Sequence, residues 1–310
     1  MIQSRGVAIL ITVLVLLSMS LGTVLTKMVF SVVSPAAFLY LSLLVGMAAM
    51  SLYTFVVKKE RIPHELMTKK IWSYVIQIAF FNFVTGTLGF FSLKYLPATT
   101  NTYLTNFIGF MTMGMSMFIL KEMPGFYQVF GAAIAFAGLR IFFPEPPKGG
   151  ELIGVIMILI SITGVAYTNN IARKLALETE NKISNNIIST LAILIGGSVA
   201  AVIYLIVDGW PPYVPRWTDW AIILYSGIVM RAMGLTIWNL ILRTLRSYEA
   251  SILGASTVIW TSILAVIILD EVLTRNQIIG IVMMLAGLIL VQVRRSLRNK
   301  PKPPATIPTH

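Results

Sequence analysis

The stretch "LKEMPGFYQVFGAAIAFAGLRI", residues 120–141, begins with a Lys–Glu pair, breaks at Pro–Gly and continues as almost unbroken apolar sequence. Residues 269–290 read "LDEVLTRNQIIGIVMMLAGLIL", and a shift of 149 positions aligns the two stretches without a gap. Identities of rarer residue types carry more weight than Leu identities in a chain of such biased composition. These identities are Glu122 with Glu271, Gln128 with Gln277 and Gly131 with Gly280. The stretch therefore indicates an internal duplication.

The composition places the chain in a membrane. Of its 310 residues, 57% are hydrophobic and 12% are charged, and the mean hydropathy is +0.83. A soluble protein of this length needs far more charge to cover its surface. The net charge of +12 comes mainly from basic residues in short loops between apolar runs, which is typical of membrane proteins. We therefore expect an integral membrane protein with no nucleic-acid partner.

Residue counts exclude several kinds of chemistry. The chain has no cysteine, so disulfides, thiolate metal sites and thiol catalysis are excluded. The two histidines, His64 in a polar loop and His310 at the end of the chain, do not suggest a multi-histidine metal site. No cluster of acidic residues and histidine suggests acid–base chemistry. We expect no metal, no cofactor and no catalytic residues.

Apolar runs long enough to span a bilayer recur along the chain. The first run, from Gly6, is longer than the apolar core of a signal peptide, so we expect it to remain as a span. Ten spans are predicted, at 6–30, 35–57, 71–93, 97–120, 125–143, 151–172, 184–207, 218–242, 248–269 and 275–294. The Pro-rich tail, 296–310, is expected to be disordered and cytoplasmic.

The duplication and the predicted spans together define an architecture. Each half, 1–146 and 147–295, holds five spans, so the second half enters the membrane from the opposite side. The predicted fold is all-α: ten transmembrane helices as two inverted five-helix repeats, with a substrate site near the midplane between them. With a cytoplasmic N-terminus, 17 of the 24 Lys and Arg residues lie on the cytoplasmic side and 6 on the other. This excess predicts that both termini are cytoplasmic, and we expect the cell (plasma or inner) membrane.

The duplicated fragments also resemble a known family. "LKEMPGFYQVFGAAIAFAGL" and "LDEVLTRNQIIGIVMMLAGL" share the pattern L-x-E…Q-x-x-G…A-G-L, and "KYLPATTNTYLTNF" and "TLRSYEASILGAST" precede them. These features are similar to the EamA family of the drug/metabolite transporter superfamily, over about residues 6–294. The resemblance implies a transporter with two EamA repeats. It leaves the substrate open, because the family handles amino acids, other metabolites and drugs.

Arg231 lies midway along the predicted span 218–242, where a charge costs about 2.5–3.5 kcal/mol on insertion scales. It is expected to face a cavity or a partner, with Trp238 as a neighbouring wall at helical spacing. The alternative is a structural arginine that binds backbone carbonyls or snorkels. All twelve Asp and Glu residues lie in loops or near span ends. This distribution argues against cation/proton antiport through a buried carboxylate and favours a neutral, zwitterionic or anionic substrate.

Other polar side chains at membrane depth are further candidates for substrate binding. They lie in the third, fourth, sixth and ninth predicted spans: Asn82, Tyr103, Asn106, Asn169, Thr257 and Trp260. Such groups need a hydrogen-bond partner, which either a neighbouring helix or a substrate supplies. Both interpretations remain open at this point.

Charged residues near span ends are candidates for gating or structural roles. Glu122 and Glu271 each precede a predicted helix, where the macrodipole and free N–H groups favour a carboxylate. The predicted topology puts them on opposite sides of the membrane, as matching gate elements. Lys27 lies near the end of the first span, in a region that a loose alignment matches with Asn169 in the sixth span. Its alternative role is to extend its charged group outward from the span end.

Glycines in the duplicated stretch predict packing grooves. Gly131 and Gly138, like Gly280 and Gly287, are seven residues apart and so share one helical face. Small residues at such spacing mark close helix–helix contacts in membranes.

The leading hypothesis is a secondary transporter that exports small polar metabolites, such as amino acids, by alternating access. A multidrug exporter is the alternative, and the absence of a buried acid counts against it for cationic drugs. A membrane-embedded enzyme is a third hypothesis, from a different class. The expected partners are a small-molecule substrate and the lipid bilayer, and a homodimer is left open.

Overall fold

The computed structural model describes residues 5–121, 123–233 and 254–298, and over these residues it contains helices and no strand. The helices of the first half are α1 (Arg5–Val29), α2 (Pro35–Ser51), η1 (Leu52–Val57), η2 (His64–Leu66), α3 (Lys69–Ala79), η3 (Phe80–Thr85), α4 (Leu88–Phe91), η4 (Ser92–Lys94), α5 (Ala98–Thr105), α6 (Ile108–Ile119) and α7 (Phe126–Phe142). Those of the second half are α8 (Gly149–Glu178), α9 (Asn185–Asp208), α10 (Trp217–Tyr225), η5 (Ser226–Met233), α13 (Thr257–Leu269) and α14 (Arg275–Arg298). The all-helical prediction is confirmed for the described residues.

Five helical stretches are long and apolar enough to cross a bilayer. They are Leu10–Val29, Pro35–Val57, Lys69–Lys94, Gly149–Glu178 and Asn185–Asp208. Three shorter apolar helices accompany them among the described residues: Phe126–Phe142, Thr257–Leu269 and Arg275–Val291. These helices fall within the predicted spans to within a few residues. Parts of the predicted spans 218–242 and 248–269 lie outside the described residues, and the count of ten spans stays a prediction.

The duplication is visible in where helices begin and end. The shift of 149 residues carries α3 onto α10, α6 onto α13 and α7 onto the start of α14, each to within a few residues. The repeated glutamine forms the same hydrogen bond in both halves. Gln128 Oε1 accepts from Gly125 N at 2.7 Å, and Gln277 Oε1 accepts from Thr274 N at 2.9 Å. Each glutamine thereby satisfies a backbone N–H group at the start of its helix.

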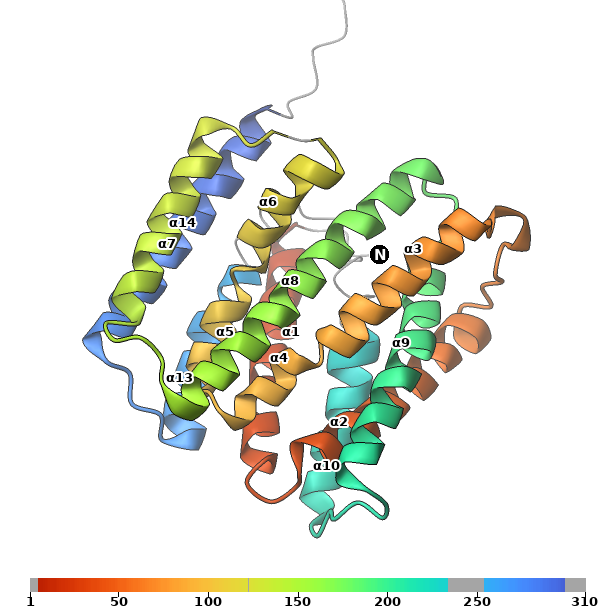
Figure 1. Ribbon diagram of the computed structural model, residues 1–310, viewed down its shortest axis with the longest axis horizontal. Coiled ribbons are helices and arrows are strands. Elements are labelled where there is room, and N and C mark those ends of the chain that lie inside the picture. The colour runs from red at the N-terminus through yellow and green to blue at the C-terminus, as the bar shows by residue number, and fades with distance from the viewer. Residues whose placement is uncertain (1–4, 122, 234–253, 299–310) are drawn as a thin grey trace, which may run out of the picture.

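The two duplicated helices pack against each other through their glycines, and Figure 1 shows α7 and α14 side by side. A Cβ added at Gly131 would lie 2.6 Å from the carbonyl oxygen of Gly287, and one added at Gly138 would lie 3.0 Å from that of Gly280. The partner's number falls as the residue number rises, so the helices run antiparallel. The predicted packing grooves are confirmed: they face one another.

Several other contacts between the halves come in matched pairs. Helix α1 packs on α13 while α8 packs on α6, and α2 packs on η5 while α9 packs on η3. Helices α2 and α9 also pack on each other. Exchanging the two halves turns each of these contacts into its counterpart.

Candidate binding cavity between the two halves

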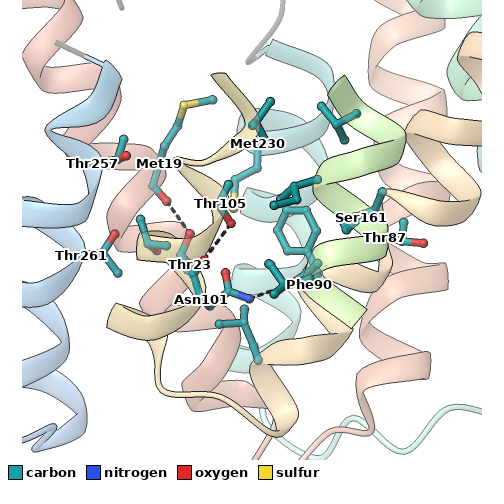
Figure 2. A pocket seen from close by; sticks show the side chains of 18 of the residues that line it. Met19, Thr23, Thr87, Phe90, Asn101, Thr105, Ser161, Met230, Thr257 and Thr261 are labelled. Atoms are coloured by element: carbon teal, nitrogen blue, oxygen red, sulfur yellow. Dashed lines mark hydrogen bonds between the residues drawn. The ribbon is translucent and has the colours of Figure 1, made fainter. Parts of the chain in front are cut away.

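A cavity of about 380 Å³ lies between the two halves. Its walls come from α1, η3, α4, α5 and α6 of the first half and from α8, η5 and α13 of the second. Figure 2 shows Thr257 and Thr261 on α13 at one side, with Ser161 and Phe90 across from them. The volume lies near the lower end of the range for small-molecule sites, about 300–1,000 Å³.

Two stretches of π-helix contribute polar residues to this cavity. Asn82 lies in η3 and Arg231 lies in η5, and both line the cavity. A π-helical turn widens the backbone spiral, and such turns occur frequently at functional sites. Both residues were predicted to bind substrate on the grounds of a polar side chain within a span.

Arg231 is held from two sides. Its Nε donates a 3.0 Å hydrogen bond to Ser42 Oγ on α2, and its guanidinium carbon lies 4.8 Å from the centre of the Phe90 ring. Its Nη2 is buried and has no hydrogen-bond partner among the described residues. Gly46 makes room for the side chain, because a Cβ there would lie 3.1 Å from Arg231 Cβ.

Most hydroxyl groups of the lining are already engaged as donors. Thr23 donates to Met19 O at 3.3 Å, Thr105 to Asn101 O at 2.8 Å, and Thr257 to Gly254 O at 2.9 Å. Donation to a carbonyl of the same helix leaves the hydroxyl oxygen able to accept. The predicted residue Thr257 lines the cavity in this form.

Four polar groups of the lining have no partner among the described residues. The side chains of Thr102 and of the half-buried Asn82 form no hydrogen bond with these residues, and Thr261 Oγ1 and Arg231 Nη2 are buried without a partner among them. Asn101, in contrast, is structural, since its amide donates to Gly89 O at 2.8 Å and to Ser92 Oγ at 2.7 Å. Buried polar groups in native proteins are normally hydrogen-bonded, so open ones at a cavity indicate a ligand site.

Four other predicted residues lie off the lining. Tyr103 is fully buried, with its ring stacked at 4.0 Å on Phe142. Asn106 donates to Thr102 O at 2.9 Å, one turn earlier, and Asn169 donates to Thr112 Oγ1 at 3.3 Å. The indole N–H of Trp260 is buried and has no partner among the described residues. Their roles in binding stay predictions, and Trp238 lies outside the described residues.

Several lining residues went unrecognised in the sequence, notably Met19, Phe90 and Ser161. A threonine or serine in a span is too common to single out, because its hydroxyl can bond to its own helix. The break between α5 and α6, at Asn106 and Phe107, also changes which residues of that span share a face.

Lys27 and Glu271 bind the backbone on either side of the non-helical segment between η4 and α5. Lys27 Nζ donates to Leu93 O at 3.0 Å and to Leu96 O at 2.5 Å. Glu271 accepts from the amides of Ala98 at 2.6 Å and Thr99 at 3.2 Å. The expectation that Glu271 serves its own following helix is therefore corrected: Glu271 binds the start of α5 in the other half, while Gln277 serves α14. Glu122 lies outside the described residues.

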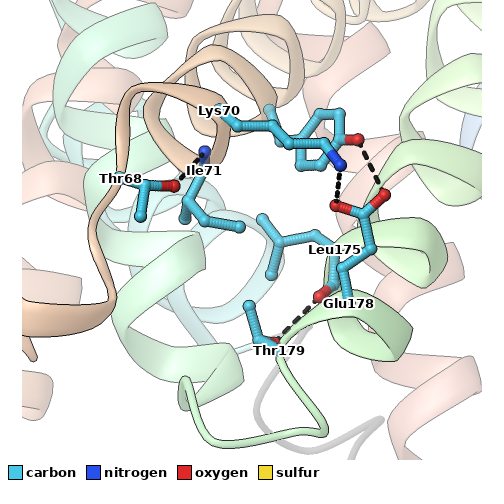
Figure 3. Close-up of polar contacts among 7 residues, drawn as sticks. Thr68, Lys70, Ile71, Leu175, Glu178 and Thr179 are labelled. Carbon is cyan, nitrogen blue, oxygen red and sulfur yellow. Dashed lines mark hydrogen bonds and ion pairs between the residues drawn. The ribbon is translucent and has the colours of Figure 1, made fainter.

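A second polar cluster joins the halves at the other end of α3 and α8, as Figure 3 shows. Lys70 Nζ lies 2.8 Å from Glu178 Oε2, and Tyr74 donates to Glu178 Oε1 at 3.1 Å. Thr68 caps α3 beside them by accepting from Ile71 N at 3.4 Å. This cluster was not singled out in the sequence, because a charge pair at two span ends reads there as ordinary solvated loop residues.

An apolar helical chain with a cavity between two duplicated halves, mostly apolar and carrying a few polar groups, is typical of a membrane transporter. The chain matches the EamA-like transporter family over residues 6–144 and 152–293 and belongs to that family. It is a multi-pass integral membrane protein and a transporter.

Individual relatives agree with this assignment. An uncharacterized transporter from Clostridium kluyveri is 26% identical over 208 residues, which are 64% of this chain and 65% of the relative. The chain thus matches about two thirds of that relative's length. A protein of known crystal structure is similar in fold, with a TM-score of 0.62 and 14% identity, covering 96% of this chain and all of the other.

Proposed function

We propose that the protein exports small polar metabolites that carry a carboxylate, such as amino acids, by alternating access. The observation that carries the proposal is Arg231, a cation at the cavity whose Nη2 has no partner among the described residues. An unpaired charge in a low-dielectric site is costly, and a substrate carboxylate would offset that cost. Arginine presents a planar edge that suits a carboxylate.

The lining supports this choice over a multidrug exporter. Among the described residues, its polar side chains are hydroxyl groups, two amides and one arginine, without an Asp or Glu. A carrier that exchanges protons for cationic drugs uses a buried carboxylate within the membrane. Because the lining offers a cation instead, an anionic or zwitterionic substrate is the better match.

Two inverted halves, 1–146 and 147–295, would supply the motion. The antiparallel pairing of α7 with α14 supports inversion, because equivalent helices of inverted halves run in opposite directions. The matched contacts between the halves support it as well. Alternating access in such folds is largely the rocking of one half against the other around a fixed site.

Polar clusters at opposite ends of the helix bundle would act as gates. With both termini cytoplasmic in the cell membrane, Lys27 and Glu271 lie at the external end, and Lys70 and Glu178 at the cytoplasmic end. Each cluster joins one half to the other, so opening on either side requires one of them to separate.

A counterflow screen in proteoliposomes tests the function. The purified protein would be offered amino acids, nucleosides and organic anions, together with variants Arg231→Gln and Arg231→Lys. Transport of carboxylates by the unaltered protein, with a loss of at least about tenfold in Arg231→Gln, is expected for one lost charged contact.

The matched control is Arg140→Gln, since Arg140 is exposed and donates to Phe143 O and Pro144 O at a helix end. Its counterflow should equal that of the unaltered protein. A folded Arg231→Gln variant that moves every active substrate normally would overturn the role of Arg231. Preferred transport of permanent cations would favour the multidrug alternative.

A further inference from the structure

Asn82 and Arg231 occupy the same position in the duplicated sequence. The shift of 149 residues that aligns α7 with α14 also carries residue 82 onto residue 231. Both lie in π-helical stretches, η3 and η5, and both line the cavity from opposite halves. The duplication has therefore kept a polar side chain and an unusual backbone spiral together at one place in each half.

The two side chains differ in chemistry. A guanidinium is a cation with donors only, whereas a carboxamide is uncharged and offers both a donor and an acceptor. Neither is fully engaged by the protein: the half-buried Asn82 forms no side-chain hydrogen bond with the described residues, and the buried Nη2 of Arg231 has no partner among them. Amides and hydroxyls elsewhere in the lining, such as Asn101 and Thr105, donate to neighbouring groups.

The surroundings of Arg231 limit what it can bind. The Nε of Arg231 already donates to Ser42 Oγ, and the ring of Phe90 lies against the face of the guanidinium. Nη2, which is buried and has no partner among the described residues, is the donor left for a ligand, and a guanidinium suits a carboxylate. Because Asn82 has no charge, it would bind a second carboxylate less strongly than an arginine would. Its carbonyl oxygen can accept a hydrogen bond from an ammonium or hydroxyl group.

We propose that Asn82 and Arg231 hold opposite ends of one substrate, the carboxylate at Arg231 and a hydrogen-bonding group at Asn82. The substrate class is then small carboxylates with a second polar group, amino or hydroxyl, rather than simple fatty or aromatic acids. This inference rests on the proposed function for the carboxylate end and adds the recognition of the other end. Thr261, whose buried hydroxyl has no partner among the described residues, lines the same cavity.

Binding of matched compounds to the purified protein tests the inference, since binding avoids the passive leak of weak acids. Each series keeps one apolar side chain: phenylalanine, phenyllactate, phenylpropionate and the decarboxylated amine phenethylamine, then leucine and its counterparts. The unaltered protein should bind the amino or hydroxy acid about tenfold more tightly than the unsubstituted acid, the value of one good hydrogen bond. The comparison of amino with hydroxy acids distinguishes the two possible second groups.

The variant Asn82→Leu should bind substituted and unsubstituted acids equally while still preferring acids over the amine. Arg231→Gln should show the opposite pattern, with the preference for acids lost. Asn82→Ala provides the same comparison with a smaller side chain, should leucine disturb the fold. Asn185→Leu, at an exposed position at the start of α9, should behave like the unaltered protein.

An exchange of the two residues gives a second readout. The double variant Asn82→Arg/Arg231→Asn should regain at least about tenfold of the carboxylate affinity that Arg231→Asn alone loses, because the positions are equivalent. A folded Asn82 variant that keeps the full preference for the substituted acid would overturn the inference and leave the proposed function intact. An unaltered protein that binds no carboxylate of either series would overturn the proposed function itself.

Discussion

Glu271 Oε1 accepts a 2.6 Å hydrogen bond from the backbone amide of Ala98, although the two residues belong to different halves of the chain. Helix α5 begins at Ala98, after Pro97. The first N–H groups of a helix have no partner within it, and the helix dipole favours a negative charge there. The carboxylate therefore stabilises the start of α5 and ties it to the segment that follows α13.

The variant Glu271→Gln should lower the stability of the folded protein. An amide keeps one acceptor oxygen but loses the charge and the second acceptor, so a loss of about 1–2 kcal/mol is expected. Thermal unfolding of the detergent-solubilised protein measures it. Asp270→Asn is the control, because residue 270 is exposed and has a positive φ of 54°, which asparagine adopts readily. Equal melting temperatures for the two variants would contradict a capping role.

Lys27 and Glu271 should be energetically coupled, because they bind the backbone on the two sides of the segment that joins η4 to α5. Lys27 binds the carbonyls of Leu93 and Leu96, and Glu271 binds the amides that follow Pro97. Lys27→Met should destabilise the protein by about 1–3 kcal/mol, since it leaves carbonyl groups without their donor.

The double variant Lys27→Met/Glu271→Gln tests the coupling. Groups that share one structural element usually show an interaction energy of about 0.5–3 kcal/mol in a double-mutant cycle. The double variant should therefore lose less stability than the two single losses added together. Strict additivity in thermal or chemical unfolding would show that the two residues act independently.

The glycine contacts between α7 and α14 give a third prediction. Gly131→Ala places a methyl group 2.6 Å from the Gly287 carbonyl oxygen, and a backbone atom cannot move aside without shifting the helix. Overpacking of this kind typically costs about 1–3 kcal/mol. Gly114→Ala is the matched control within α6, since no atom lies within 4 Å of a Cβ there, and it should be neutral or stabilising. Equal stability of the two variants would contradict tight packing at Gly131.

These contacts show what the sequence could and could not reveal. The duplicated stretch predicted glycine-lined packing grooves on the last helix of each half, because residue spacing alone decides which side chains share a helical face, but it did not predict that these two grooves face each other. The cost of burying Arg231 and Asn82 also marked two residues that line the cavity. Both arguments depend only on local spacing and on the membrane as a solvent.

Relationships between distant segments were beyond the reach of the same arguments. Glu271 was expected to serve the helix that follows it, but the fold brings α5 of the other half to its carboxylate. Tyr103 and Asn106 were predicted to lie in one continuous span, 97–120, whereas the helix ends at Thr105 and a new one begins at Ile108, and Tyr103 packs on Phe142. A helical wheel assumes an unbroken α-helix, and breaks and π-helical turns displace every later residue.

The cluster of Lys70, Tyr74 and Glu178 is expected to open during transport. The pair of Lys70 and Glu178 is partly exposed, with 64% and 30% of the side chains accessible. An exposed pair contributes at most about 1 kcal/mol. Lys70→Gln should therefore leave the folded state almost as stable as before, so the cluster can separate at little cost.

Cross-linking measures whether that separation is required. Because the chain has no cysteine, Lys70→Cys/Glu178→Cys introduces the only two thiols, which a short bismaleimide can join. The linked protein should still bind substrate but should lose counterflow, since α3 and α8 can no longer part at this end. Glu145→Cys/Lys148→Cys is the matched control, because those residues form an exposed pair at 3.9 Å within one loop. Normal counterflow in the fully linked α3–α8 variant would show that these helix ends stay together throughout the transport cycle.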